Sequence, residues 1–241
     1  IKKILEFEFD LIVIGAGSGG LAAAKRAACY GARVAIIEVN KIGGTCVVRG
    51  CVPKKLMVFA AKSKKNIDSS EGYGLKSKSI NFDSRILLQN VREEVSRLSK
   101  LHRNSLDKLN VTVFEGLGRF TTQNELEIIC PKTKKILNKV NSKKILISVG
   151  GKPKKLNIPG IELAWTSDDI FKLEKFPKSI LIVGGGYIAC EFASIFSNLG
   201  IEVTQLIRGH RLLNGFDEDL SSCLEESHTF TGINIISNNQ L

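Results

Sequence analysis

Residues 9–20 read FDLIVIGAGSGG, and this stretch decides the fold. Its first six residues form an almost wholly apolar run, which is typical of a strand buried in a parallel sheet. A glycine-rich loop follows, and we expect a helix from Leu21 to Tyr30. A second apolar strand is expected from Arg33 to Ile37, with an acid directly after it. This order of strand, glycine loop, helix, strand and acid predicts a mononucleotide-binding unit.

Each glycine of this loop has an expected role. Gly15 permits the tight turn, Gly17 lets the backbone approach a pyrophosphate, and Gly20 allows the helix to pack closely on the strand. The pyrophosphate is expected at the helix N-terminus, beside Ser18 and Gly19. A purely structural glycine turn is the alternative, and the flanking strands and the terminal acid disfavour it.

A second unit of the same kind begins about 170 residues later. We expect a strand over Ser179–Val183, a glycine loop over Gly184–Ala189 and a helix to about Leu199. Two further strands are expected, over Ile201–Ile207 and Ile233–Ile236. Two nucleotide-binding units in one chain indicate electron transfer between two cofactors.

The two units differ in the residue that follows the second strand. Glu38 follows it in the first unit, where an acid is placed to accept hydrogen bonds from a ribose diol. Arg208 follows it in the second unit, where an arginine can pair with a 2′-phosphate, so NADP is favoured over NAD. Arg208 could instead be an exposed loop cation without a ligand. The basic residues at positions 210 and 211 favour its interpretation as a phosphate-binding residue.

The rest of the chain predicts an α/β fold with two Rossmann-like units and two domains, residues 1–155 and 156–241. A helix is expected over Met57–Ile67 and a long amphipathic helical stretch over Phe82–Leu109. Short β runs over Val111–Ile147 predict a small antiparallel meander inserted in the first domain. The turn-rich segment from Gly150 to Gly160 is the expected boundary.

Two cysteines follow the first unit in the segment GGTCVVRGCVPKK, residues 43–55. Cys46 and Cys51 are spaced so that both sulfurs can share a helix face, and a thiolate near a helix N-terminus and a lysine has a depressed pKa. A metal site is disfavoured because the three histidines are scattered without ligand spacing. The pair therefore predicts a reversible disulfide. The other four cysteines are expected to be buried or inert, namely Cys29, Cys130, Cys190 and Cys223.

The composition is that of a globular chain, with 241 residues, 43% hydrophobic residues and a formal charge of +11. Its lysine clusters have no aromatic or arginine partners, which disfavours nucleic-acid binding. A positive field would instead steer small anions such as phosphorylated cofactors. The sequence contains no membrane-length apolar run and no signal-peptide pattern, so a cytoplasmic protein without membrane contact is expected.

These segments resemble a known family. Residues 43–55, behind the first glycine loop and ahead of residues 184–191, closely resemble the flavin-dependent pyridine nucleotide–disulfide oxidoreductases. Within that family, residues 49–57, Arg208 and residues 216–219 are similar to glutathione reductases of the cyanobacterial and plant type. Dihydrolipoamide dehydrogenases fit less well, because they usually carry Pro-Ser-Lys after the second cysteine.

The resemblance implies an FAD-dependent NADPH:glutathione-disulfide reductase, in which electrons pass from NADPH through FAD to the Cys46–Cys51 disulfide and then to glutathione disulfide. Cys51 would lie nearest the flavin, and Cys46 would attack the substrate. Lys54 would pair with Glu191, and Tyr187 would move aside for the nicotinamide.

The resemblance also implies three sets of contacts. The FAD set is Gly15, Gly17, Ser18, Gly19, Gly20, Glu38, Gly44, Thr45, Cys46, Lys54, Gly118 and Gly150. The NADP set is Gly184, Gly185, Gly186, Ile188, Ala189, Glu191, Arg208 and Asn214. The substrate set is Ser18, Lys25 and His102, and no metal is implied.

The chain departs from the glutathione reductases in three respects. Asn214 stands where many have a second phosphate-binding arginine, for which Arg211 could substitute. Lys25 and His102 stand where the substrate site often has arginine and tyrosine. The chain matches only the N-terminal half of a family member, and the second FAD segment, the dimer-interface domain and its histidine–glutamate pair lie in the other half.

The resemblance implies a homodimer for the full-length enzyme and little turnover for this segment alone. The alternatives are a related enzyme of the dihydrolipoamide dehydrogenase or trypanothione type and a non-catalytic flavin-binding fragment.

Overall fold

The computed structural model describes residues 7–75 and 81–241, and the chain divides into two compact units. Unit 1 comprises the residues up to Pro53 together with Glu93–Asp168. Unit 2 comprises Lys54–Arg92 and Asp169–Leu241. The expected domains place residues 54–92 with the first nucleotide-binding unit instead, and their boundaries stay a prediction.

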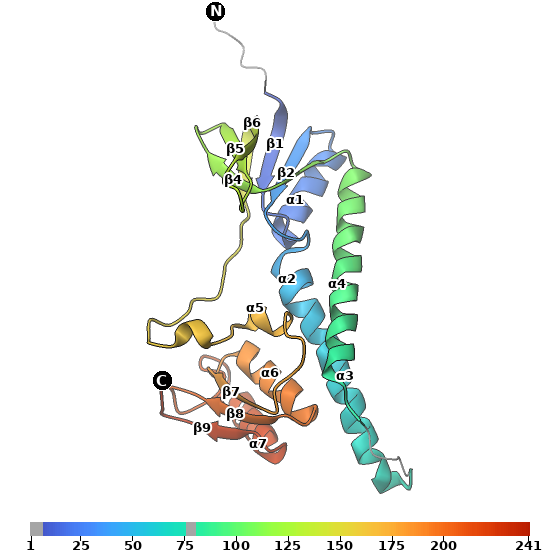
Figure 1. The fold of residues 1–241 in the computed structure, drawn as a ribbon, viewed down its shortest axis with the longest axis vertical. Coiled ribbons are helices and arrows are strands. Elements are labelled where there is room, and N and C mark those ends of the chain that lie inside the picture. Colours follow the sequence, from blue (N-terminus) through green and yellow to red (C-terminus); the bar gives the residue numbers. More distant parts are fainter. Residues whose placement is uncertain (1–6, 76–80) are drawn as a thin grey trace, which may run out of the picture. The chain divides into compact units, whose positions relative to one another are not determined.

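Unit 1 is built on a six-stranded sheet in the order β3-β2-β1-β6-β5-β4. Figure 1 labels five of these strands, β1, β2, β4, β5 and β6. The strands are β1 (Phe9–Ile14), β2 (Val34–Glu38), β3 (Thr112–Glu115), β4 (Leu117–Phe120), β5 (Glu125–Ile129) and β6 (Ile136–Ile147). The first four in spatial order are parallel, and β5 and β4 continue the sheet with antiparallel pairing. The expected nucleotide-binding unit is confirmed, with the predicted strand Phe9–Ile14 matching β1.

The expected meander over Val111–Ile147 was wrong at both of its ends. β3 pairs in parallel with β2, and the last six residues of β6 pair in parallel with β1. Only β4, β5 and the first half of β6 form the antiparallel meander. The long strand β6 pairs with β5 along its first half and with β1 along its second, and short β runs alone do not reveal that change of partner.

Successive residues of β1 pack on opposite faces of this sheet. Val13 lies with Leu21 and Ala24 of helix α1 (Ser18–Cys29) in one hydrophobic cluster. Ile12 lies with Leu126 in a second cluster, on the face that the meander covers. Because β1 is buried on both faces, its sequence does not need to alternate between polar and apolar residues.

Unit 2 holds a three-stranded parallel sheet in the order β7-β8-β9. Its strands are β7 (Ser179–Val183), β8 (Glu202–Leu206) and β9 (Asn234–Ile236). Helix α6 (Tyr187–Asn198) connects β7 to β8, and helix α7 (Glu218–Phe230) precedes β9. The second predicted unit is therefore confirmed as a βαβ arrangement. The short helices are α2 (Gly44–Arg49), η1 (Ser70–Tyr73), η2 (Ile161–Leu163) and α5 (Ser167–Ile170).

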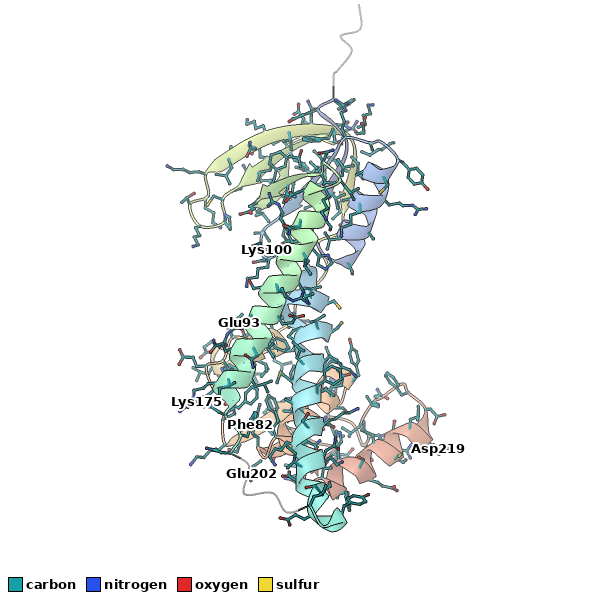
Figure 2. All side chains as sticks on the ribbon, turned by 90° about the vertical axis from the view of Figure 1, so that its right-hand side faces the viewer. Phe82, Glu93, Lys100, Lys175, Glu202 and Asp219 are labelled. Atoms are coloured by element: carbon teal, nitrogen blue, oxygen red, sulfur yellow. The ribbon has the colours of Figure 1, made fainter. Side chains whose placement is uncertain are left out.

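Two long helices, α3 (Cys51–Ser69) and α4 (Ser84–Asp107), contribute to the core of unit 2. Met57 of α3 and Leu88 of α4 are fully buried in one cluster with Phe192 and Phe196 of α6. Phe82, labelled in Figure 2 just before α4, stacks on Phe176 with ring centroids 6.4 Å apart. Within residues 7–75 and 81–241, none of the helices combines the length and apolar character that a membrane span requires.

Candidate functional site

The first glycine loop connects β1 to α1, at the carboxyl end of the parallel strands. Gly15 has φ +103°, a conformation that favours glycine, and its N–H donates to Ile37 O at 2.8 Å. A Cβ at Gly20 would lie 1.9 Å from the carbonyl oxygen of Gly15. Gly20 thus lets helix α1 begin directly against the loop, which is the packing role expected for it.

Glu38 closes the other side of this loop. Its carboxylate accepts the N–H of Ala16 at 2.7 Å and the N–H of Asn40 at 2.8 Å. The acid therefore ties the end of β2 to the glycine loop, next to the position where a ribose diol is expected.

The start of α2 touches the glycine loop. Gly44 has φ +63°, and a Cβ there would lie 2.5 Å from the Cα of Gly17. Two glycines facing each other let two backbones approach more closely than any side chain would allow. This contact brings the cysteine segment to the first glycine loop.

The two cysteines lie on separate helices, which corrects the expectation of one shared helix face. Cys46 is in α2 and Cys51 is the first residue of α3, and Gly50 between them has φ −145° and ψ −117°. A Cβ at Gly50 would lie 2.8 Å from the carbonyl oxygen of Thr45. Gly50 thus separates the two helices, and the Cys46 and Cys51 thiols still lie within hydrogen-bonding reach of each other.

Cys46 and Cys51 carry free thiols in this structure. The pKa of Cys46 is raised, first by a hydrogen bond with the Cys51 thiol and second by burial. The expected depression of the pKa was therefore wrong for Cys46 in the reduced pair. Hydrogen bonding to a neighbouring thiol and burial both favour the neutral form of Cys46.

One cavity of about 610 Å³ in unit 1 is lined by both the glycine loop and the cysteine pair. The predicted residues that line it are Gly15, Gly17, Ser18, Gly19, Glu38, Gly44, Thr45, Cys46, Cys51, Gly118 and Gly150. These residues come from four separate stretches of sequence. Their gathering in one cavity is consistent with a single elongated ligand that reaches from a ribose-binding acid to a dithiol.

Sequence reasoning missed several residues of this cavity. They are Ile14, Ile37, Val39, Asn40, Lys41, Val48, Arg49, Gly116, Leu117, Ser148 and Val149. Many of them follow or end β1, β2 and β6, and ligands of open α/β sheets bind at the carboxyl ends of the strands. That rule, applied to the predicted strands, could have found Ile14 and Ile37.

Lys54 and Glu191, 137 residues apart in the sequence, form an ion pair within unit 2. The Nζ of Lys54 on α3 lies 2.6 Å from Oε1 of Glu191 on α6. Both side chains are partly exposed, at 21% and 41%. Lys54 does not line the cavity of unit 1, but it follows Cys51 by less than one turn of α3.

The second glycine loop follows β7 in the same way that the first follows β1. Gly184 has φ +132° and donates to Leu206 O at 2.9 Å. Gly185 O accepts the N–H of Leu213 at 2.6 Å. The remaining loop residues of the NADP set, Gly186, Ile188 and Ala189, follow at the start of α6, and Tyr187 is 61% exposed.

The cations beyond β8 differ in their partners. Arg208 is exposed and forms no ion pair with a carboxylate among the described residues. Arg211 instead lies 3.0 Å from the carboxylate of Glu218. Asn214 is exposed on the same segment. Arg208 thus has no carboxylate partner in the described part of the chain, whereas Arg211 has one, and the phosphate-binding role of Arg208 stays a prediction.

The two expected substrate residues outside the loop lie close together. The pKa of His102 is lowered by burial and by the positive charge of Lys25. Neither residue lines the cavity of unit 1, whereas Ser18 does.

The other cysteines follow the expectation only in part. Cys190 is buried, but Cys29 and Cys223 are exposed and Cys130 is intermediate. Among the residues that the structure describes, no group of three or more histidine, cysteine or acidic side chains is arranged to hold a metal ion.

Comparison with known proteins shows the class to which these sites belong. A family model described as pyridine nucleotide-disulphide oxidoreductase matches residues 9–241. The chain belongs to the pyridine nucleotide-disulphide oxidoreductase family, and membership implies the use of a flavin and a pyridine nucleotide.

The relatives it resembles include glutathione reductases. That of Nostoc sp. is 45% identical over 235 residues, which are 98% of this chain and 50% of the relative. That of Burkholderia cepacia is 40% identical over 230 residues, 95% and 50% of the two chains. The chloroplastic/mitochondrial enzyme of Pisum sativum is 40% identical over 224 residues, 88% of this chain and 39% of that one.

A solved structure has the same architecture. The Cu(II) complex of the HOCl-induced flavoprotein disulfide reductase RclA from Escherichia coli matches with a TM-score of 0.84 and 29% identity, covering 98% of this chain and 50% of that chain. The chain thus spans about half the length of the proteins it matches.

Proposed function

We propose that this chain carries the FAD site, the NADPH site and the redox-active pair of a glutathione-disulfide reductase. The observation that carries the proposal is the single cavity that the first glycine loop, Glu38 and both cysteines line together. The similarity to three glutathione reductases supports glutathione disulfide as the substrate and a homodimer as the full-length assembly.

The residues of the cavity suit FAD. Gly17 and Gly44 both line the cavity, and their backbones approach so closely that a Cβ at Gly44 would clash with Gly17, so we expect the pyrophosphate to bind against backbone at the start of α1. Glu38 would hold the ribose, and Thr45 and Gly118 would contact the bound cofactor. When bound, FAD supplies the two-electron chemistry that connects NADPH to the disulfide.

The chain's own cysteines would perform the exchange with the substrate. The Cys46 thiolate would attack one sulfur of glutathione disulfide and release one glutathione, leaving a mixed disulfide. The Cys51 thiolate would then attack the Cys46 sulfur, which releases the second glutathione and forms the Cys46–Cys51 disulfide. Because the pKa of Cys46 is raised, its proton has to be taken up by a base before the attack.

Thiol counting tests the electron path in this chain directly. The chain, oxidised and loaded with FAD, is treated with NADPH without oxygen, and its thiols are then alkylated and counted. Two additional alkylated thiols are expected in the wild type and in the control Cys29→Ser, which removes an exposed cysteine outside the cavity. Cys46→Ser and Cys51→Ser are expected to gain none, and a wild-type gain in either variant would contradict the proposal.

Glutathione-dependent turnover is expected to be low for these 241 residues alone. The family resemblance assigns proton transfer at the leaving thiol to a histidine–glutamate pair outside them. NADPH oxidation on adding glutathione disulfide measures this, with the full-length enzyme as reference. Turnover rates of the full-length enzyme with lipoamide and with trypanothione disulfide, compared with the rate for glutathione disulfide, distinguish a glutathione reductase from the related reductases.

A further inference from the structure

Gln205 is a polar side chain in the core of unit 2. It lies on β8 with 0% of its surface exposed. Its Nε2 donates to Gly184 O at 2.9 Å and lies 3.6 Å from the sulfur of Cys190. Its Oε1 is buried and has no hydrogen-bond partner in the described part of the chain. An unpartnered buried oxygen costs free energy, so folding alone would favour an apolar side chain at this position.

The partner of Gln205 is the carbonyl that begins the second glycine loop. Two successive carbonyls of this loop point inward. Gly184 O accepts from Gln205, and Gly185 O accepts from the N–H of Leu213 at 2.6 Å. The sulfur of Cys190 lies 3.7 Å from Gly185 O. The two loop carbonyls are therefore contacted by Gln205 of β8, Cys190 of α6 and Leu213 of the segment after β8.

This inward direction sets where the N–H groups of the loop point. In a trans peptide the C=O of one residue and the N–H of the next point in opposite directions. With Gly184 O and Gly185 O directed inward, the N–H groups of Gly185 and Gly186 are directed outward. The outward side is the accessible one, because Gly186, Tyr187 and Ile188 are exposed. Outward N–H groups at a helix N-terminus are the donors that a pyrophosphate requires.

We propose that Gln205 is a positioning residue for the pyridine nucleotide. By holding the carbonyl of Gly184, its amide keeps the N–H of Gly185 directed at the pyrophosphate of NADPH. The inference rests on the proposed binding of NADPH to the second glycine loop. It explains why a fully buried side chain in unit 2 keeps one unpartnered polar atom.

The variant Gln205→Met tests this role. Methionine keeps the unbranched shape but has no amide, so NADPH should bind about three- to tenfold more weakly, the range expected for one net hydrogen bond. The urea midpoint of unfolding should change little, because the variant removes the unpartnered Oε1 but also removes the donor to Gly184 O. Adenosine 2′-phosphate, which lacks the pyrophosphate, should bind both proteins equally.

Thr204→Val is the matched control. Thr204 is the neighbour of Gln205 on β8, and its polar side chain points to the opposite face of the sheet. NADPH should bind this variant as it binds the wild type. Fluorescence titration or equilibrium dialysis measures each dissociation constant, and a cooperative urea unfolding transition verifies that each variant is folded.

The outcomes separate the inference from the proposed function. Equal NADPH affinities of wild type and Gln205→Met would overturn the inference and leave the proposed function intact. A lower urea midpoint with unchanged affinity would show a structural role and would also overturn it. A wild-type chain that binds FAD but no NADPH would refute the nucleotide assignment and the inference with it.

Discussion

His228 shows how one side chain can make stability depend on pH. The side chain is 2% exposed, its Nε2 lies 3.0 Å from the hydroxyl oxygen of Ser194, and its buried Nδ1 has no partner in the described residues. Burial lowers its pKa below the ordinary value of 6.5, although the charge of Glu225 acts in the opposite direction. The folded state therefore favours the neutral imidazole more than the unfolded state does.

This shift predicts a loss of stability in mild acid. Above pH 6.5 the imidazole is neutral in both states, and the stability that it contributes is fully present. As the pH falls from there toward the lowered folded pKa, the unfolded state binds a proton that the folded state does not. The free energy of unfolding should fall by at most about 1.4 kcal/mol per pH unit, the limit for one proton.

Urea unfolding of His228→Gln between about pH 7.5 and pH 5.5 measures the effect, because this range spans the ordinary histidine pKa. The variant should show a smaller pH dependence than the wild type. His210→Gln, at an exposed position, is the control and should keep the wild-type dependence. Since all three proteins retain His102, an equal pH dependence in all of them would contradict the role of His228.

At the scale of elements, the junction of the first glycine loop and α1 depends on the absence of one methyl group. A Cβ at Gly20 would lie 1.9 Å from the backbone oxygen of Gly15, and backbone cannot move aside as a flexible side chain can. The neighbouring Gly19 lies in the same helix with nothing within 4 Å of its Cβ position. These two glycines make a matched pair for experiment.

Gly20→Ala should destabilise the chain by roughly 1–3 kcal/mol, the range for overpacking, and should weaken FAD binding. Gly19→Ala should be neutral or stabilise by about 0.4–1 kcal/mol, since alanine restricts the unfolded chain and suits a helix. The urea-derived free energy of unfolding compares the two variants. Similar losses of unfolding free energy in both variants would show that the close contact between Gly20 and Gly15 does not determine the stability of this junction.

At the scale of the whole molecule, each unit contains a complete glycine loop with its own supporting contacts. The first loop rests on Glu38 and the Gly17–Gly44 contact, and the second loop rests on Gln205 and Leu213. Binding of FAD and binding of NADPH should therefore slow hydrogen exchange in different parts of the backbone.

Hydrogen exchange followed by mass spectrometry tests this separation. FAD should slow exchange in residues 15–19, 44–51, 116–118 and 148–150, and NADPH in residues 184–189 and 208–214. At a ligand concentration of about 100 times the dissociation constant, binding should also stabilise the chain by about 2.7 kcal/mol. NADPH protection of the first glycine loop in a chain free of FAD would contradict the assignment of the two sites.

The sequence by itself determined the two βαβ units, their glycine loops and the cysteine pair, because these depend on local periodicity and on the steric freedom of glycine. Local patterns in the sequence did not predict which residues far apart in the chain come into contact. Only the tertiary structure decided that β3 joins the parallel sheet and that Gly50 places the cysteines on two helices. It also decided that Glu38 and Cys51 share one cavity and that Gln205 supports the second glycine loop. These features arise from packing between distant segments, and no local pattern of residues records which distant partner a strand, loop or side chain will meet.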